Sequence, residues 1–364
     1  MALALALQRQ GNSVRIFEAR QRGNVRNDAR ILALSHGSRQ ILESLGVWGQ
    51  IAATPIAAIH VSQRGSLGRT RFAASEEGLP ALGYVVAAAN LGAALDSALL
   101  AAGVPYLEQA RVDRADCSDA GVHLHTSGGE AEARLVVYAE GSAGVSADAD
   151  AEAIVRDYRQ SAVICSVDVA APHGNIAWER FTDHGPVALL PLGSKMALVY
   201  SCASERALAL AQLGEAEFLT DVQRLFGTRL KFSGASQRRV FPLTLRLRRA
   251  PVAERAVWLG NAAQTLHPVA GQGFNLALRD VAQLARTLVA ASDPGAAELL
   301  RGYARARRLD RIATIGCTDA LARLFTIDLP LASAARGGAL LALDLLPPLR
   351  HFVARRMIFG ARAF

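Results

Sequence analysis

The sequence predicts a mixed α/β fold in which an antiparallel β-sheet domain is inserted between two parts of an α/β domain. Three observations lead to this prediction. The chain has 364 residues, about the length of two domains. Apolar strand-like segments alternate with helix-like segments in the first part of the chain and return after residue 250. Residues 156–248 are mostly strand-like, with turn residues between the strands and one predicted helix over 205–226.

These observations divide the chain into three stretches. Residues 1–155 form the first part of the α/β domain, with a strand excursion near 56–80. Residues 156–250 form the sheet domain, and residues 251–364 complete the α/β domain and add C-terminal helices. Because the middle stretch interrupts the other two, the α/β domain is predicted to be discontinuous in sequence.

Composition excludes several classes of protein. Apolar residues make up 51% and charged residues 20% of the chain, which excludes wholesale disorder. The net charge is +8, and Lys195 and Lys231 are the only lysines, so the excess is carried by arginine. Coding bias or attraction to an anionic partner explains this excess. The arginines are scattered without a nucleic-acid-binding motif, so we expect no nucleic-acid partner.

The distribution of cysteine and histidine argues against a metal site or a disulfide framework. The four cysteines lie far apart without a CxxC pair, as is typical of a reducing compartment. His123 and His125 alternate on a predicted strand with no third ligand nearby in the sequence, so we interpret them as surface residues. The apolar start lacks a basic region and a cleavage site, and no apolar run approaches the length of a membrane span. We expect a cytoplasmic protein.

The first segments are typical of the second half of a β-α-β dinucleotide-binding unit. A helix is predicted to end near Gly11, and an apolar strand over 14–18 ends in Glu18. In such units an acidic residue at this position bonds a ribose hydroxyl. The GxGxxG turn that should precede the helix is not in the sequence. Either the chain is truncated at its start, or the unit has lost its phosphate loop.

Further helices are predicted after Ser35 and over 90–102, and strands over 111–125. The segment 135–139 is apolar on both faces, which is typical of a buried parallel strand, and it ends in Glu140 and Gly141.

The most informative stretch is VWLGNAAQTLHPVAGQGFNLALRD, residues 257–280. It predicts a buried strand, a Gly-Asn turn, a loop with His267 and Pro268, and a helix that begins near Asn275 after Gly271 and Gly273. Small residues before a helix leave backbone N–H groups unshielded, and the helix dipole adds positive potential. Such a site suits a phosphate or the electron-rich edge of a flavin ring. The alternative is that the glycines serve only backbone clearance.

This stretch resembles the third flavin-binding motif of the class A flavoprotein monooxygenases, which have the para-hydroxybenzoate hydroxylase fold. Within them it is most similar to the ubiquinone-biosynthesis hydroxylases, and closest to the 2-octaprenyl-6-methoxyphenol hydroxylase branch. The wider family has Gly-Asp where this chain has Gly260 and Asn261, a form that this branch uses. NDARILALS, residues 27–35, resembles the family's second segment, whose arginine is Arg30 here. LVVYAEGS resembles its strand ending in Asp-Gly, with Glu140 in place of Asp.

Further resemblance over residues 179–192 and 313–325 extends the match to nearly the whole chain. It implies an FAD-binding Rossmann-type domain, and an enzyme whose FAD is reduced by NAD(P)H. A flavin C4a-hydroperoxide then hydroxylates the ring of a polyprenylated phenol. The implied FAD-binding residues are Glu18, Arg30, Val112, Glu140, Gly141, Gly260, Asn261, Pro268, Gly271, Gln272, Gly273, Phe274 and Asn275.

Some assignments stay open at this point. The sequence names no catalytic base, and His267 either tunes the pocket or simply packs. The rival hypothesis is a flavin-free scaffold, or a truncated fragment of such an enzyme. The C-terminal region 329–364 mixes leucine-rich helix with five arginines. It is either a helix pair packed on the flavin domain, or a face that binds an anionic membrane or other proteins of the ubiquinone pathway.

Overall fold

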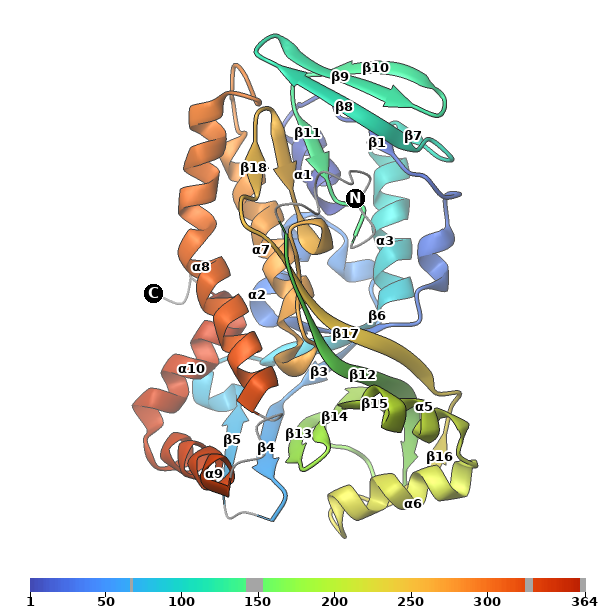
Figure 1. Ribbon diagram of the computed structural model, residues 1–364, viewed down its shortest axis with the longest axis vertical. Coiled ribbons are helices and arrows are strands. Elements are labelled where there is room, and N and C mark those ends of the chain that lie inside the picture. Colours follow the sequence, from blue (N-terminus) through green and yellow to red (C-terminus); the bar gives the residue numbers. More distant parts are fainter. Residues whose placement is uncertain (66–67, 142–152, 325–329, 361–364) are drawn as a thin grey trace.

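The computed structural model describes residues 1–65, 68–141, 153–324 and 330–360, and the following account concerns those residues (Figure 1). The helices are α1 Ala2–Arg9, α2 His36–Ser44, α3 Ala88–Ala101, α5 Ser204–Gln212, α6 Glu215–Phe226, α7 Gln272–Thr287, α8 Ala297–Leu324, α9 Pro330–Leu345 and α10 Pro347–Phe359. Short 3₁₀ helices include η4 Gly260–Ala262 and η5 Val269–Gly271. None of the described helices has both the length and the hydropathy to cross a bilayer.

The strands are short in the α/β part and long in the inserted part. The α/β part contributes β1 Ile16–Phe17, β2 Ile31–Ser35, β3 Ala53–Ile56, β6 Gly83–Ala87, β7 Tyr106–Leu107, β8 Val112–Ser118, β9 Gly121–Thr126, β10 Gly129–Ala133, β11 Val136–Tyr138, β18 Val252–Ala253 and β19 Ala256–Trp258. The large sheet contains β4 Ala58–Gln63, β5 Arg69–Ala73, β12 Ala153–Val169, β13 Ile176–Thr182, β14 Gly185–Leu192, β15 Lys195–Ala203, β16 Phe232–Ala235, β17 Arg239–Arg248 and β20 Gln264–Thr265.

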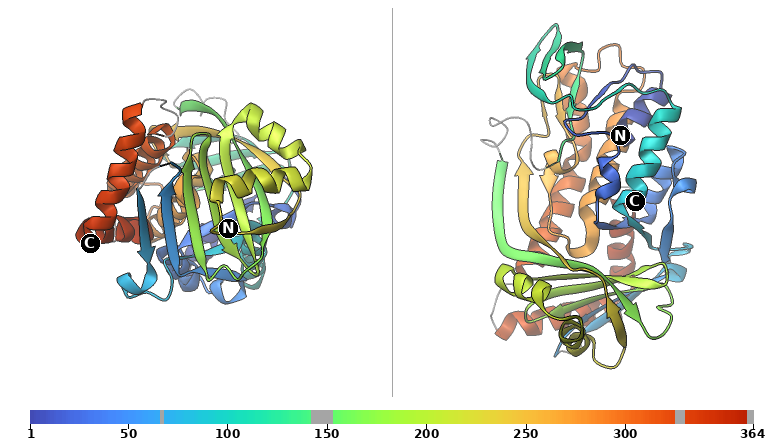
Figure 2. Two further views of the ribbon diagram at one scale, coloured as in Figure 1. Left: turned by 90° about the horizontal axis from the view of Figure 1, so that it is seen from below. Right: turned by 90° about the vertical axis from the view of Figure 1, so that its right-hand side faces the viewer.

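The molecule is elongated, and two of its sheets lie at opposite ends. Helices α7 and α8 run along the long axis; the β8–β9–β10 sheet lies at one end and the nine-stranded sheet at the other (Figure 1). Figure 2 shows α5 and α6 covering the outer face of the large sheet. Tyr200 of β15 and Phe218 of α6, both fully buried, belong to the core between them. The α/β fold with a sheet inserted between its parts is the predicted one. The inserted strands pair antiparallel as predicted, and β4 from the α/β part pairs in parallel with β13.

The parallel strands form two separate ladders. Strand β1 pairs in parallel with β7, and β11 pairs in parallel with β19, which continues antiparallel to β18. No described strand lies between these ladders in the hydrogen-bonded order. Val14 packs against the apolar cores next to both ladders, so apolar contact connects the two ladders where hydrogen bonds do not. The parallel pairing of segment 135–139 was predicted correctly. Its full burial was not, because Val136 and Val137 are only half-buried.

The inner face of the nine-stranded sheet is turned toward the α/β part. The predicted excursion near 56–80 is real: β4 joins this sheet beside β13, and β5 forms its edge. On the inner face Ala177 packs with Ile56 of β3 and Val85 of β6. Strand β12 begins at residue 153 and β20 joins from residues 264–265, so the sheet extends slightly beyond 156–250. The domain boundaries at 155 and 250 stay predictions.

Two predicted helix boundaries were wrong. The single helix predicted over 205–226 is two helices, because Leu213 and Gly214 are extended. The Gly214 N–H donates to the Glu217 carboxylate (3.3 Å), so the second helix is capped separately. The helix predicted from Asn275 begins at Gln272, because Gly271 already provides the left-handed residue that precedes the first turn.

A buried network of charged side chains joins α7 to α8. Arg279 donates to Asp310 (2.8 Å), and Arg307 donates to both Asp280 (2.6 Å) and Asp310 (2.6 Å). All four side chains are at most 6% exposed. Arg279 and Arg307 hold the pKa of Asp310 below its usual range, although burial acts to raise it. Each charge therefore has an opposite charge in contact, which fixes α7 relative to α8.

Candidate functional site

The N-terminus of α7 begins at a tight turn of the backbone. Ala270 and Gly271 both have left-handed φ values (62° and 58°), and the Gly271 N–H donates to the Pro268 carbonyl (2.9 Å). A Cβ on Gly271 would lie 3.3 Å from the Cβ of Ala33 in β2, so the turn approaches β2 closely. The backbone N–H groups of the first turn have no acceptor within the helix. Together with the helix dipole they offer hydrogen bonds to an electron-rich group.

Asn275 ties this turn to β2 and uses its whole amide to do so. Its nitrogen donates to the carbonyls of Ala33 (3.0 Å) and Gly271 (2.8 Å). Its oxygen accepts from the Ser35 N–H (2.8 Å) and the Ser38 hydroxyl (2.7 Å). The side chain is buried and has no hydrogen-bonding capacity left. The predicted contact of Asn275 with a cofactor is thereby limited to its backbone.

Gly273 differs from Gly271 because it faces open space. A Cβ built on Gly273 meets no protein atom within 4 Å. Its φ is not left-handed, so nothing in the backbone requires glycine there. Gln272, by contrast, points back into the protein and donates weakly to the Ala270 carbonyl (3.3 Å) and the Met357 carbonyl (3.5 Å). Phe274 packs partly buried on the core of the α/β part.

His267 is held as a neutral imidazole. Its Nδ1 accepts from the Val269 N–H (3.1 Å), so Nε2 carries the proton and donates to the Gln160 side chain in β12 (3.2 Å). Burial lowers the pKa of His267 to about 4. Both ring nitrogens are therefore used to attach the loop to the large sheet. This arrangement favours the packing role among the two that the sequence left open.

The other predicted residues fall into two groups. Gly260 and Asn261 form the turn η4, which contacts α7, and Gly260 has the left-handed φ (59°) that this turn requires. Arg30 immediately precedes β2 and donates to Asp28 (2.6 Å). Partial burial acts to raise the pKa of Asp28, but the hydrogen bonds and charge of Arg30 hold it below its usual value. Asn261 and Arg30 are both exposed, so their polar groups are accessible to a ligand.

The second group lies at the ends of the parallel strands. Glu18 follows β1, and its carbonyl accepts from the Ala110 N–H (2.9 Å). Val112, two residues after Ala110, is the first residue of β8. The Glu18 carboxylate accepts from the Arg20 N–H (3.0 Å) and remains partly exposed. Glu140 and Gly141 follow β11, and Gly141 has a left-handed φ (97°). Both acidic residues thus follow the carboxyl ends of parallel strands, where such sheets bind ligands.

Sequence reasoning missed three residues that build the site. Ser35 and Ser38 hold Asn275, and Gln160 holds His267. Ser35 was visible as a candidate N-cap of α2, which it is, with Ser38 N–H donating to its hydroxyl (3.2 Å). No local signal marked Gln160, because its partner is 107 positions away.

The predicted residues offer the kinds of donor that FAD requires. The α7 first turn offers N–H groups beside an uncovered Gly273, and Arg30 offers a cation to a phosphate-bearing chain. Asn261 has an exposed amide for a polyol, and Glu18 has a carboxylate for a ribose. The predicted donor set therefore fits the dinucleotide.

Comparison with known proteins agrees with this fit. The family model described as "FAD binding domain" matches residues 1–315. Ubiquinone hydroxylase UbiL of Rhodospirillum rubrum is 33% identical over 339 residues, covering 90% of this chain and 79% of that protein. The 3-demethoxyubiquinol 3-hydroxylase of Escherichia coli is 31% identical over 370 residues, covering 94% of this chain and 91% of that one. Klebsiella pneumoniae HpxO, solved in complex with FAD and uric acid, superposes with a TM-score of 0.77 at 17% identity, covering 100% and 94% of the two chains.

The protein is thus a flavoprotein with the para-hydroxybenzoate hydroxylase fold and FAD as its cofactor. The chain belongs to the FAD-dependent aromatic-ring monooxygenases of ubiquinone biosynthesis.

The contrast between the two glycines of the turn gives a test of the cofactor site. Gly273→Leu should leave the thermal midpoint unchanged or slightly raised, because the new side chain enters open space and leucine favours a helix by about 0.8 kcal/mol. It should weaken FAD binding by at least about tenfold, or 1.4 kcal/mol, because the side chain occupies the cofactor's approach. Flavin fluorescence titration and thermal denaturation measure the two effects.

Two further variants serve as controls for this test. Gly302→Leu in α8 also enters open space and should leave FAD binding unchanged. Gly271→Ala should destabilise the fold by about 1–2 kcal/mol, because alanine is strained at a left-handed φ. Undiminished FAD affinity in Gly273→Leu would show that the cofactor does not approach this turn.

Proposed function

We propose that the protein hydroxylates the aromatic ring of a polyprenylated phenol in ubiquinone biosynthesis, with NAD(P)H as electron donor and O₂ as the source of oxygen. The names of the Rhodospirillum rubrum and Escherichia coli relatives, 33% and 31% identical, support the pathway. The fit of the α7 turn to a flavin supports the reaction type. Bound FAD would supply the redox and oxygen chemistry, in which a flavin C4a-hydroperoxide is the hydroxylating species implied by the family.

The chain's own contribution begins at the α7 turn. Its free N–H groups and helix dipole stabilise negative charge on the edge of a ring placed before them. Asn275 and His267 make no further hydrogen bonds and instead hold this turn against β2 and β12. The turn is therefore preorganised, so little reorganisation accompanies the development of charge.

We place the phenol on the inner face of the large sheet, because Glu179 carries a half-buried carboxyl group there. Glu179 lies in β13, opposite Ala188 of β14 and Val61 of β4. It shares its face of the strand with Ala177, because side chains alternate along a strand. Ala177 packs toward Val85 of β6, so Glu179 is on the side of the sheet that faces the α/β part.

Glu179 has the properties of a base for a phenolic proton. Its side chain is half-buried, and within the described residues it makes no hydrogen bond or ion pair. Burial raises the pKa of Glu179 to about 7. A carboxyl group with this pKa accepts a proton near neutral pH, and removing the phenolic proton makes the ring more electron-rich toward an electrophilic oxygen. We assign Glu179 this role in the proposed reaction.

The proposed activity is tested with the purified protein, added FAD, NAD(P)H and a short-tailed prenylphenol. We expect a hydroxylated ring that contains oxygen from isotopically labelled O₂, detected by mass spectrometry. Consumption of NAD(P)H without a labelled product would show that the flavin site works but that the substrate class is wrong. A protein that retains no visible flavin spectrum would instead support the scaffold hypothesis.

Replacing Glu179 tests the base. Glu179→Gln should lower kcat by about 100- to 10,000-fold and remove the rise of kcat with pH near 7, while FAD binding stays unchanged. Asp183→Asn, in the exposed turn of the same hairpin, is the matched control. An unchanged pH profile of kcat in Glu179→Gln would exclude the role as base.

The same variant has a readout that is independent of activity. Because the pKa of Glu179 is raised from 4.5 to about 7 in the folded protein, ionisation opposes folding. The native protein should lose stability as the pH rises from about 4.5 through 7, by roughly 2–3 kcal/mol in total. Glu179→Gln should lack this loss in denaturant titrations at successive pH values.

We also propose that the C-terminal helices bind an anionic membrane surface, where a polyprenylated substrate dissolves. Leu345, Leu346 and Leu349, around the junction of α9 and α10, are 66%, 53% and 42% exposed. Arg355 lies nearby on α10 and is exposed. An exposed apolar group with a cation nearby is typical of an interfacial segment. Proteins of the same pathway are the alternative partners for this surface.

Vesicle flotation tests the membrane proposal. The double change Leu345→Glu and Leu346→Glu should reduce binding to anionic vesicles by at least about tenfold, because it adds two charges where apolar contact is expected. Leu208→Glu, an equally exposed leucine on α5 (59% exposed), is the control and should bind normally. If the native protein does not float with anionic vesicles, the membrane proposal is wrong.

A further inference from the structure

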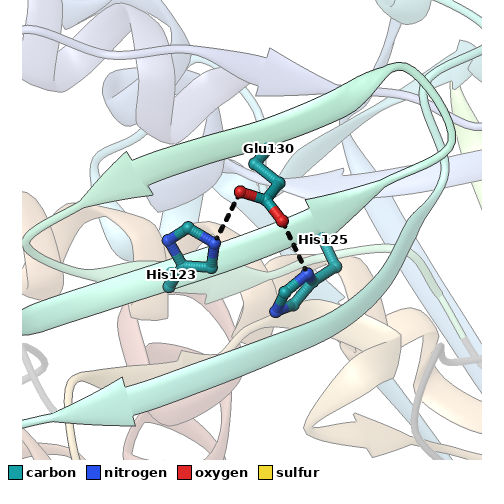
Figure 3. Close-up of side chains that lie close together, drawn as sticks. All are labelled: His123, His125 and Glu130. Carbon is teal, nitrogen blue, oxygen red and sulfur yellow. Dashed lines mark ion pairs between the residues drawn. The ribbon is translucent and has the colours of Figure 1, made fainter.

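The β8–β9–β10 sheet carries two histidines and a glutamate on its solvent face, and none of the three is among the proposed FAD-binding residues. His123 and His125 are two positions apart on β9, so both point to the same side of the sheet. Val122, which precedes His123, and Leu124, which lies between the histidines, are buried on the other side. Glu130 of β10 lies opposite His125 in the antiparallel register. Figure 3 shows its carboxylate between the two imidazoles.

The three side chains converge on one point. The Nε2 atom of His123 is 3.2 Å from one Glu130 oxygen, and the Nδ1 atom of His125 is 3.5 Å from the other. One ligand atom from each residue lies within 4.8 Å of those of the other two. Two imidazole nitrogens and a carboxylate at such separations match the ligand set of zinc sites that have three protein ligands.

A fourth residue holds His125 in the orientation that a metal requires. The Oδ2 atom of Asp116 in β8 lies at hydrogen-bond distance (2.9 Å) from Nε2, the other ring nitrogen of His125. A proton on Nε2 leaves Nδ1 free to face Glu130. Histidines that bind metals characteristically donate their other N–H to a carboxylate in this way. His123 and His125 thus differ from two unrelated surface histidines.

The charges around this group are mixed. Arg114 forms an ion pair with Asp116 (2.6 Å) and also lies 3.3 Å from His125 Nε2. The Asp116 carboxylate accepts hydrogen bonds from both Arg114 and His125. Glu132 lies opposite His123 on β10 and adds a second negative charge on the same face. The carboxylates therefore compensate a cation despite Arg114.

We propose that His123, His125 and Glu130 form a binding site for a divalent metal ion of the zinc class, with Asp116 as the residue that positions His125. Three protein ligands leave one tetrahedral position for water. The ion would join β9 to β10 across the hairpin.

Isothermal titration of the metal-free protein with Zn²⁺ tests this site. We expect one ion per chain, with affinity reduced by at least about 100-fold in His123→Gln, His125→Gln and Glu130→Gln, which each lose a ligand. Asp116→Asn should weaken binding by about 10- to 100-fold, because it removes only the positioning hydrogen bond. His184→Gln changes an exposed histidine in another turn and should bind as the native protein does.

The changes lie on a solvent face, so the variants should keep the native circular dichroism spectrum and FAD content. Zn²⁺ binding that is equally strong in the double variant His123→Gln and His125→Gln would place the ion elsewhere, for example on the exposed thiol of Cys317, and would overturn the proposal. The absence of any binding in the native protein would overturn it as well. In that case the three residues form only ion pairs across the strands.

Discussion

The buried ion pairs between α7 and α8 are the constraint on which the site depends. A charge removed from water is tolerated only when an opposite charge and further hydrogen bonds compensate it. Arg279, Asp280, Arg307 and Asp310 satisfy this condition only while the two helices keep one relative position. The ion pairs along α7 therefore fix the position of its N-terminal end against β2. The first turn of the helix can then keep one conformation while it remains accessible to a ligand.

Segments distant in the sequence meet at this turn. Asn275 bonds Ser35, 240 positions away, and His267 bonds Gln160, 107 positions away. Closing such long loops costs entropy that only a complete fold repays. The proposed cofactor site therefore requires β2, β12 and α7 together, so it joins the inserted sheet to the α/β part although their cores are separate.

The sequence predicted features that depend on local chemistry. The glycine turn before α7, a strand leading to Glu18 and the parallel character of segment 135–139 all follow from turn residues and apolar runs, although β1 is shorter than the predicted strand 14–18. Features that depend on register between strands were missed. Glu130 became a neighbour of His125 only through the pairing of β10 with β9, and the environment of Glu179 depends on which face of β13 it occupies. A helix break at Leu213 was missed because the residues around it favour helix on both sides.

Asn275 and Gly273 are two positions apart, but contacts within the protein constrain only the identity of Asn275. The amide of Asn275 donates twice and accepts twice inside the protein, and no other side chain of that size can do both. Its identity is dictated by folding, so a descendant that had abandoned redox chemistry would still need it. The fold does not require glycine at position 273, since a Cβ built there meets no protein atom within 4 Å. Among homologues, a bulky residue at position 273 beside an unchanged asparagine at 275 would therefore mark a lineage that kept the architecture and gave up the flavin.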